Sequence, residues 1–194
     1  MPRLVPAVVP SGRMRESEQP ILQPSGDLTL RPWSSSDAPE VCSAFADPDI
    51  QYWHMRELVT EVEAASWIAA WRERWNAETD GSWAITSTSS GDLLGQVALR
   101  TVNLEFGYAQ ITYWVLPASR RQGVATYAAA AVSGWALDDL GLHRLEIRHS
   151  TANEPSCGVA QKVGFASEGT MRSALLHADG WHDMHAHALV SSRR

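Results

Sequence analysis

The sequence predicts one mixed α/β domain, and three observations support that prediction. The chain has 194 residues, of which 44% are hydrophobic and 20% are charged, as in an ordinary globular domain. Apolar residues recur with helix and strand periods, and the two kinds of segment are interspersed from residue 27 to residue 192. Neither an internal repeat nor a linker divides this part of the chain, so we expect a single domain over residues 27–192.

Residues 1–26 precede that domain and lack any hydrophobic period. They contain five prolines, at positions 2, 6, 10, 20 and 24, and we expect a flexible tail. Met14 offers a second translation start, so the sequence leaves open whether residues 1–13 belong to the native protein.

The first elements of the domain are a short strand and two helices. Leu28–Pro32 alternates apolar and polar residues and is closed by proline, as a strand would be. Ser36-Asp37 can cap a helix over residues 37–46, before the Asp47-Pro48 break. Thr60 and Glu63 form a capping box that opens a helix to about residue 76. One face of this helix carries Ala64, Ile68, Trp71 and Trp75.

The remaining elements alternate strands with two further helices. Strands are expected at residues 82–87, 93–102, 108–116, 144–148, 166–176 and 181–190, and helices at residues 124–140 and 153–163. Gly141 and Gly164 lie just past the two helices, where glycine is favoured. Trp83, Trp135 and Trp181 fall within these patterns and are expected in the core.

Composition argues against several classes of protein. The net charge of −6 does not suit a nucleic-acid-binding protein, and no run of about 18 apolar residues predicts a membrane span. Cys42 and Cys157 fit neither a disulfide framework nor a zinc signature, so a cytoplasmic protein is expected. Asp183, His185 and His187 share one face of the last strand, but their spacing is not a known zinc signature, and no metal is predicted.

The loop from Arg120 to Ala125 is the most informative segment. It follows a strand that ends at Leu116-Pro117 and opens the helix over residues 124–140. The first turn of a helix has unpaired N–H groups and the positive end of the helix dipole, and Gly123 lets an anion approach the backbone. Arg120 and Arg121 add positive charge. The loop is therefore either an anion site or an ordinary turn with surface arginines.

This loop resembles motif A of the GNAT acetyltransferase superfamily, and the resemblance extends along residues 27–190. Ser82-Trp83-Ala84-Ile85 and Leu94-Gly95 resemble the family's first hairpin. Asn153-Glu154-Pro155-Ser156, Lys162-Val163-Gly164-Phe165, Glu168-Gly169 with Arg172, and Gly180 with Asp183 resemble the branch that acetylates ribosomal-protein N-termini. The resemblance implies a mixed, mostly antiparallel sheet of six or seven strands, splayed at the cofactor site, with about four helices.

The resemblance also implies acetyl-CoA as cosubstrate and a set of binding residues. The strand backbone that would hold the pantetheine belongs to Trp114, Val115 and Leu116. Phosphate contacts would come from Arg120, Arg121, Gln122, Gly123, Val124, Ala125 and Thr126. Asn153 would touch the cofactor arm, and Ser156 would protonate the departing thiolate. Both also suit a helix cap, and the two roles are compatible.

The general base is where this chain departs from the family pattern. Gln110, Tyr127 and Leu175 stand where relatives carry glutamates. Glu105, His54 and His177 are candidate substitutes, and a water chain is an alternative to any single base.

The acceptor wall is the other open feature, because five tryptophans precede residue 76. Trp33, Trp53, Trp67, Trp71 and Trp75 would either form the acceptor wall or simply pack in the core. Trp53 and His54 are placed in a loop. With Glu105 they are the candidate acceptor-binding residues.

Three functions follow from the resemblance. The chain would transfer an acetyl group to a primary amine by direct attack in a ternary complex, and a protein or peptide N-terminus is the leading acceptor. A small-molecule amine, such as an antibiotic or a polyamine, is the alternative. A non-catalytic acyl-CoA-binding module is the third. Relatives are often dimers, so a homodimer is a further expectation.

Overall fold

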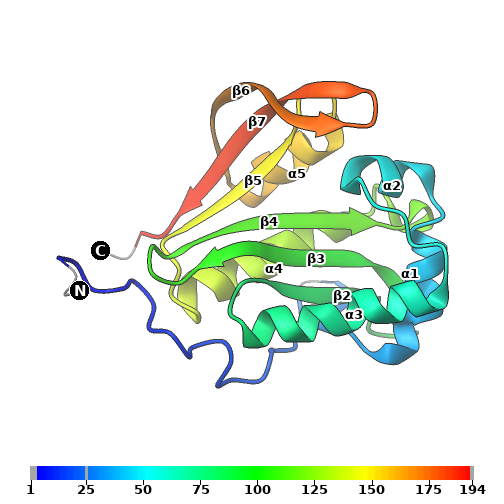
Figure 1. Cartoon of the computed structure of the whole chain (residues 1–194), viewed down its shortest axis with the longest axis horizontal. Coiled ribbons are helices and arrows are strands. Elements are labelled where there is room, and N and C mark those ends of the chain that lie inside the picture. The colour runs from blue at the N-terminus through cyan, green and yellow to red at the C-terminus, as the bar shows by residue number, and fades with distance from the viewer. Residues whose placement is uncertain (1–3, 25, 193–194) are drawn as a thin grey trace.

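A seven-stranded sheet with the order β1-β2-β3-β4-β5-β7-β6 organises the computed structural model, which describes residues 4–24 and 26–192 (Figure 1). The strands are β1 Leu28–Pro32, β2 Gly81–Ser87, β3 Leu93–Asn103, β4 Tyr108–Val115, β5 Arg144–Ser150, β6 Ala166–His177 and β7 Gly180–Val190. The helices are α1 Ala38–Ala44, α2 Pro48–His54, α3 Glu61–Asn76, α4 Val124–Asp138 and α5 Glu154–Val163, with 3-10 turns at Ser35–Asp37 and Pro117–Ser119. Among the described strands only β4 and β5 pair in parallel, so the predicted mixed, mostly antiparallel sheet is confirmed.

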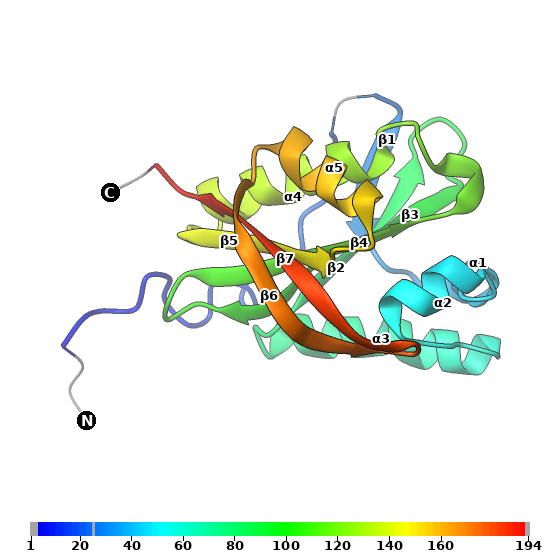
Figure 2. The ribbon, with the colours of Figure 1, turned by 90° about the horizontal axis from the view of Figure 1, so that it is seen from above.

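The helices cover both faces of the sheet. α4 and α5 lie on one face, and α1, α2 and α3 lie on the other (Figure 2). Ala64, Ile68, Trp71 and Trp75 of α3 are buried, as the helical period predicted, and Trp67 is buried as well. Thr60 and Glu63 form the expected capping box. Among the described residues, none of the helices is long and apolar enough to cross a membrane.

Helix α2 was not predicted, since its segment was read as a loop. Its first turn is capped by Asp47, whose carboxylate accepts a hydrogen bond from the Ile50 N–H at 3.0 Å, and Pro48 occupies the first helical position. Proline suits that position because it lacks only an N–H that would be unpaired. The Asp47-Pro48 pair therefore starts a helix as well as ending one, and Trp53 and His54 lie at the end of α2.

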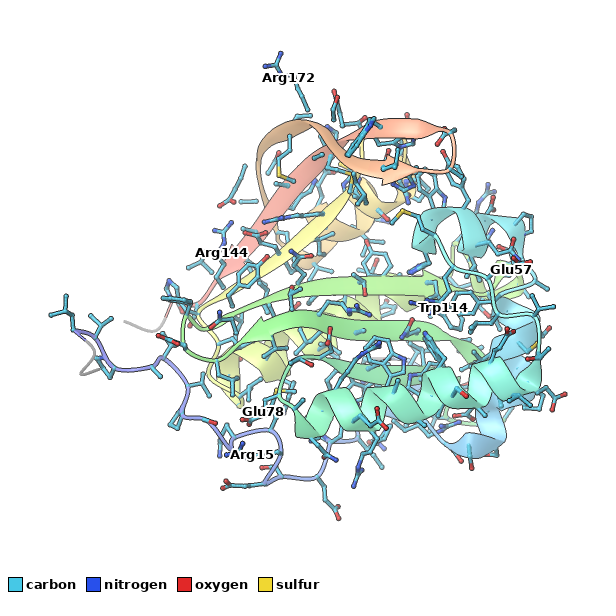
Figure 3. All side chains as sticks on the ribbon, in the orientation of Figure 1. Arg15, Glu57, Glu78, Trp114, Arg144 and Arg172 are labelled. Atoms are coloured by element: carbon cyan, nitrogen blue, oxygen red, sulfur yellow. The ribbon has the colours of Figure 1, made fainter. Side chains whose placement is uncertain are left out.

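The N-terminal segment packs on the domain and does not form the expected flexible tail over the described residues 4–24. Val9 and Met14 are buried. Glu78, just after α3, accepts hydrogen bonds from the backbone N–H groups of Gly12, at 2.8 Å, and Met14, at 2.8 Å, and this contact lies at the lower left of Figure 3. A buried carboxylate and two apolar anchors thus hold a segment that has no hydrophobic period; residues 1–3 and 25 lie outside the described residues.

Trp181 is 64% exposed, so its predicted place in the core was wrong. Trp83 is fully buried and Trp135 packs against it, with ring centroids 5.5 Å apart. Trp181 lies on β7 next to the β6–β7 turn and pairs with Leu176, which is 54% exposed. Helix α2 packs against His177 on the other face of this end, and strand alternation did not reveal that the face of Trp181 is uncovered.

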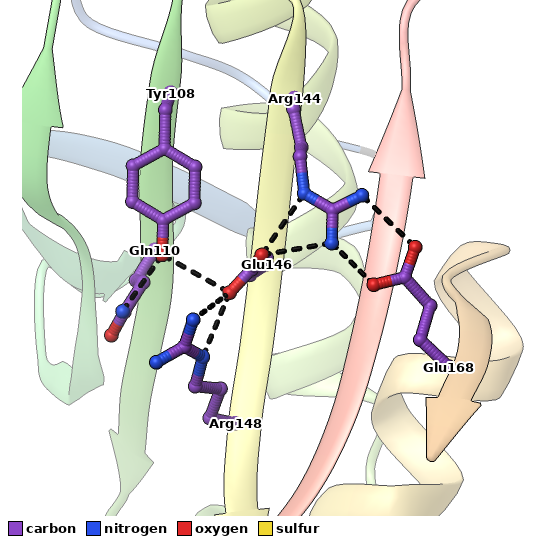
Figure 4. Close-up of polar contacts among 6 residues, drawn as sticks. All are labelled: Tyr108, Gln110, Arg144, Glu146, Arg148 and Glu168. Carbon is purple, nitrogen blue, oxygen red and sulfur yellow. Dashed lines mark hydrogen bonds and ion pairs between the residues drawn. The ribbon is translucent and has the colours of Figure 1, made fainter. Parts of the chain in front are cut away.

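The pairing of β4 with β5 ends early, and this produces the splay that the resemblance implied. The register runs only from Tyr108–Arg144 to Gln110–Glu146. At that point Glu146 is buried and accepts hydrogen bonds from Tyr108 and from two arginines, Arg144 and Arg148 (Figure 4). Arg144 also pairs with Glu168 of β6. Burial raises the pKa of Glu146, but these donors bring it below its ordinary value, and the ionised network fixes the apex of the splay.

Candidate functional site

The open side of β4 presents backbone groups of Tyr113 and Val115. On the other side, the Leu116 N–H donates to the Leu94 carbonyl at 2.9 Å, and Trp114 pairs with Gln96. Because successive residues of a strand direct their backbone groups to opposite edges, Tyr113 and Val115 face the gap. Of the residues predicted for pantetheine contact, Trp114 and Leu116 are therefore engaged with β3, and Val115 faces the gap. Tyr113, which was not among the predicted residues, faces the gap as well.

A cavity of about 600 Å³ lies at this gap. It is lined from β4 and β5, from the start of α5, from the ends of β6 and β7, and from α2 and α3. Trp53 and His54, two of the three candidate acceptor-binding residues, line it, and Asn153 and Ser156 line it as well. Glu105 is not among the lining residues: it lies in the loop before β4, at the opposite end of that strand from Val115.

The first turn of α4 forms an open anion site. Gly123 adopts a left-handed conformation with φ of 80°, and no described side chain caps the helix. A Cβ at Gly123 would lie 2.9 Å from the ring of Tyr127, so glycine is needed both for the conformation and for the space. The N–H groups of Val124, Ala125 and Thr126 have no partner one turn earlier in the helix and can bind a phosphate.

Arg120 has a different position from the one predicted. Its guanidinium pairs with Asp47 and Asp49 of the α2 start, at 2.8 Å each, and donates to the Val115 carbonyl at 3.2 Å. The side chain is thus directed to two carboxylates and ties the loop to α2. Arg121, which is exposed, is the arginine left to approach a phosphate.

The start of α5 faces β4 across the gap. The Asn153 side chain caps the helix by accepting from the Ser156 N–H at 3.2 Å, as the capping interpretation predicted. The Tyr113 hydroxyl donates to the Ser156 carbonyl at 3.3 Å. Burial raises the pKa of Tyr113 to about 12, so this hydroxyl stays protonated and remains a donor.

The histidines proposed as bases are poor proton acceptors. Burial lowers the pKa of His54 to about 4, and its Nε2 lies 3.1 Å from the Tyr113 carbonyl, to which it must donate. Burial, with neighbouring His182, also lowers the pKa of His177. Of the positions that relatives fill with glutamate, Gln110 donates to Tyr108 at 2.8 Å, Leu175 lines the cavity, and Tyr127 lies beside the anion site.

A hydrogen-bonded chain that the sequence did not reveal reaches the cavity wall at Ser150. The Ser150 Oγ and the His182 Nδ1 are 2.7 Å apart, and the His182 Nε2 lies 2.9 Å from the Asp179 carboxylate. Since Asp179 is an acceptor, His182 carries its proton on Nε2, and its Nδ1 accepts from Ser150. Tyr52 of α2 also donates to Asp179, at 2.8 Å. This serine–histidine–aspartate order suits proton transfer.

The charged residues around the cavity share one sign. Arg56, Arg100 and Arg148 line it, and among the described lining residues none is Asp or Glu. Arg100 pairs with Asp80 and Arg148 with Glu146, while Arg56 is exposed. Asp80 and Glu146 thus balance the charges of Arg100 and Arg148, and it is exposed Arg56 that favours a ligand with negative charge.

Known proteins share this architecture. The acetyltransferase (GNAT) domain model matches residues 27–166. The N-acetyltransferase YoaA of Bacillus subtilis is 24% identical over 175 residues, which cover 90% of this chain and 98% of YoaA.

Two solved structures share the fold at lower identity. The ribosomal-protein-S5-alanine acetyltransferase of Vibrio fischeri superposes with a TM-score of 0.81 at 17% identity, over 90% of this chain and 98% of that one. RimL, the ribosomal L7/L12 alpha-N-protein acetyltransferase in complex with coenzyme A, superposes with a TM-score of 0.80 at 19% identity, over 90% of this chain and 100% of RimL. The splayed sheet, the open helix start and these matches agree: the chain belongs to the GNAT acetyltransferase family and is an N-acetyltransferase that uses acetyl-CoA.

Proposed function

We propose that this enzyme acetylates the primary amine of a protein or peptide N-terminus that carries negative charge near its first residue. The observation that carries the proposal is the cavity wall, which has three arginine side chains and no aspartate or glutamate among its described residues. Two of these arginines are paired with Asp80 and Glu146, so exposed Arg56 is the charge that would attract an acidic acceptor and repel a polyamine. The resemblance to ribosomal-protein acetyltransferases supports a peptide acceptor.

The proposed cofactor path follows the gap. The pyrophosphate lies at the open N–H groups of α4, near Arg121, and the pantetheine runs along the gap-facing backbone of Tyr113 and Val115. A pantetheine amide can bind this backbone only where a carbonyl is freed. Either His54 must release the Tyr113 carbonyl or Arg120 must release the Val115 carbonyl. The thioester then reaches the start of α5, beside Asn153 and Ser156.

The reaction is direct attack in a ternary complex. The amine nitrogen bonds to the thioester carbonyl carbon, and the carbon–sulfur bond breaks. The amine proton passes to the Ser150 oxygen as the Ser150 proton passes to His182 Nδ1, and Asp179 stabilises the resulting imidazolium. The Ser156 hydroxyl gives a proton to the departing thiolate and regains one from solvent.

A thiol-release assay tests the acceptor class. Acidic peptides with a free N-terminus are compared with peptides of the same length in which each acidic residue is replaced by lysine, and with spermidine. We expect the acidic peptides to have the highest kcat/KM. Arg56→Gln should raise KM for the acidic peptides by about two- to fivefold, which corresponds to the loss of one exposed ion pair. KM for neutral peptides should stay unchanged. A higher kcat/KM for spermidine than for every peptide would overturn the proposal.

A further inference from the structure

A second cluster of reactive side chains lies behind the cavity wall, between α5 and strands β5 and β7. It consists of His149 of β5, Cys157 of α5, and His185 and His187 of β7, and is here called the His₃Cys cluster. One ligand atom of each residue lies within 4.8 Å of the others. His149 and His185 are paired across the strands, and His187 is opposite Ile147, so all three imidazoles share the face that α5 covers.

The distances within this cluster suit one tetrahedral ion. A zinc ion with bonds of about 2.1 Å to nitrogen and about 2.3 Å to sulfur places its ligand atoms about 3.4 to 3.6 Å apart. The Nε2 atoms of His149 and His187 are 3.2 Å apart, and the Cys157 Sγ is 3.9 Å from the His187 Nε2. For these two pairs, shifts of a few tenths of an ångström would give these values, and the remaining pairs lie within 4.8 Å, so a bound ion would draw the four side chains together.

The hydrogen bonds around the cluster prepare it for a cation. The His149 Nδ1 lies 2.8 Å from the Ser150 carbonyl and must donate to it, so the Nε2 that faces His187 carries a lone pair. The Gln161 amide donates to the Cys157 sulfur at 3.5 Å, which orients the sulfur within the cluster. His187 is buried, and its Nδ1 has no hydrogen-bond partner among the described residues. The 3.2 Å contact can be a hydrogen bond from a His187 Nε2–H to His149 or the two ligand atoms of one cation, and the metal titration below distinguishes the two.

We propose that His149, Cys157, His185 and His187 bind one divalent transition-metal ion, of which zinc fits best. Imidazole and thiolate are ligands that zinc prefers, and four protein ligands make a closed site of the structural type. The ion would hold the first turn of α5, with Ser156 next to Cys157, onto β5 and β7. His149 lies on the cavity wall, which gives the ion an entry path. This proposal does not depend on the identity of the acceptor.

Cobalt titration of the full-length chain, without a histidine tag and after chelator treatment, tests the site. We expect saturation at one equivalent, the visible d–d bands of tetrahedral cobalt, and a near-ultraviolet thiolate charge-transfer band. Zinc should displace the cobalt and raise the thermal unfolding midpoint. Cys157→Ser should abolish the charge-transfer band, and His185→Gln should weaken binding roughly tenfold or more. Cys42→Ser and His143→Gln are the matched controls and should keep both signals.

Two outcomes would overturn the proposal. One is a folded wild-type chain, checked by circular dichroism, that shows neither band at saturating cobalt. The other is equal spectra and affinity in Cys157→Ser and Cys42→Ser, which would identify the metal as adventitious. Because His185 is only half-buried, His185→Gln keeps the test decisive if Cys157→Ser fails to fold.

Discussion

The Ser156 hydroxyl is the proposed proton donor to the departing thiolate. The backbone N–H of Ser156 donates to the Asn153 side chain, and removal of the hydroxyl leaves this hydrogen bond in place. We therefore expect Ser156→Ala to lower kcat roughly tenfold or more, since the thiolate loses its proton donor, with an unchanged thermal midpoint. Thiol release under saturating substrates measures this. An unchanged kcat would remove Ser156 from the mechanism.

His182 is the proposed final acceptor of the amine proton, and its replacement should change the pH dependence of the reaction rate. His182→Gln removes the proton acceptor behind Ser150, so we expect kcat/KM for the amine to fall roughly a hundredfold or more. The remaining rate should rise with pH as the amine itself deprotonates. Tyr52→Phe is the control, because it removes one hydrogen bond to Asp179 and leaves the His182–Asp179 contact in place. A wild-type pH profile in His182→Gln would contradict the relay.

At the scale of elements, the proposed phosphate site is the start of α4, and two glycines of this helix region offer a matched pair of variants. Gly123→Ala places a Cβ 2.9 Å from Tyr127 at a φ of 80°, a strain of about 1–3 kcal/mol. We expect weaker coenzyme A binding by about tenfold, measured by calorimetry. Gly134→Ala, inside α4 and in open space, should instead stabilise the fold by about 0.5–1 kcal/mol and leave binding unchanged. Equal binding by both variants would show that the α4 start does not hold the phosphates.

At the scale of the whole molecule, Glu78 joins the N-terminal segment to the domain. Burial raises the pKa of Glu78, but hydrogen bonds from the N–H groups of Gly12, Met14 and Arg15 and from the Ser11 hydroxyl outweigh that effect. The pKa of Glu78 therefore lies below its ordinary value of 4.5. A carboxyl with a depressed folded pKa contributes stability above its unfolded pKa, and this contribution is lost as the pH falls through the folded value. The wild type should therefore lose this contribution below about pH 4.5.

Chemical denaturation at several pH values tests that contact. We expect Glu78→Gln to be less stable than the wild type by roughly 1–3 kcal/mol at pH 7, because the charged acceptor is lost. The difference should narrow below about pH 4.5. Glu16→Gln, at an exposed neighbour of the same segment, is the control and should match the wild type. A constant difference at every pH would contradict the assignment to the carboxylate.

How far the sequence predicted the elements depended on hydrophobic period. The strands and the long helices α3 and α4 repeat every two or 3.6 residues, and their predicted bounds agree with the structure to within a few residues. Helix α2 is only seven residues long and opens with a proline, so it offered too little period to detect. The N-terminal segment is held by Glu78 and by two isolated apolar residues, Val9 and Met14. Isolated contacts of this kind produce no hydrophobic periodicity in the sequence, so they could not be predicted from it.

The sequence by itself determined the fold and the cosubstrate, and it predicted an anion site at the start of α4, because those depend on local patterns and on a motif of contiguous residues. The tertiary structure alone decided which side chains meet. It brought Ser150, Asp179 and His182 into one chain, directed Arg120 to Asp47 and Asp49, and gathered the His₃Cys cluster. The physical reason is that these contacts cross between neighbouring strands and helices, where strand register and helix packing, and not sequence spacing, set the distances.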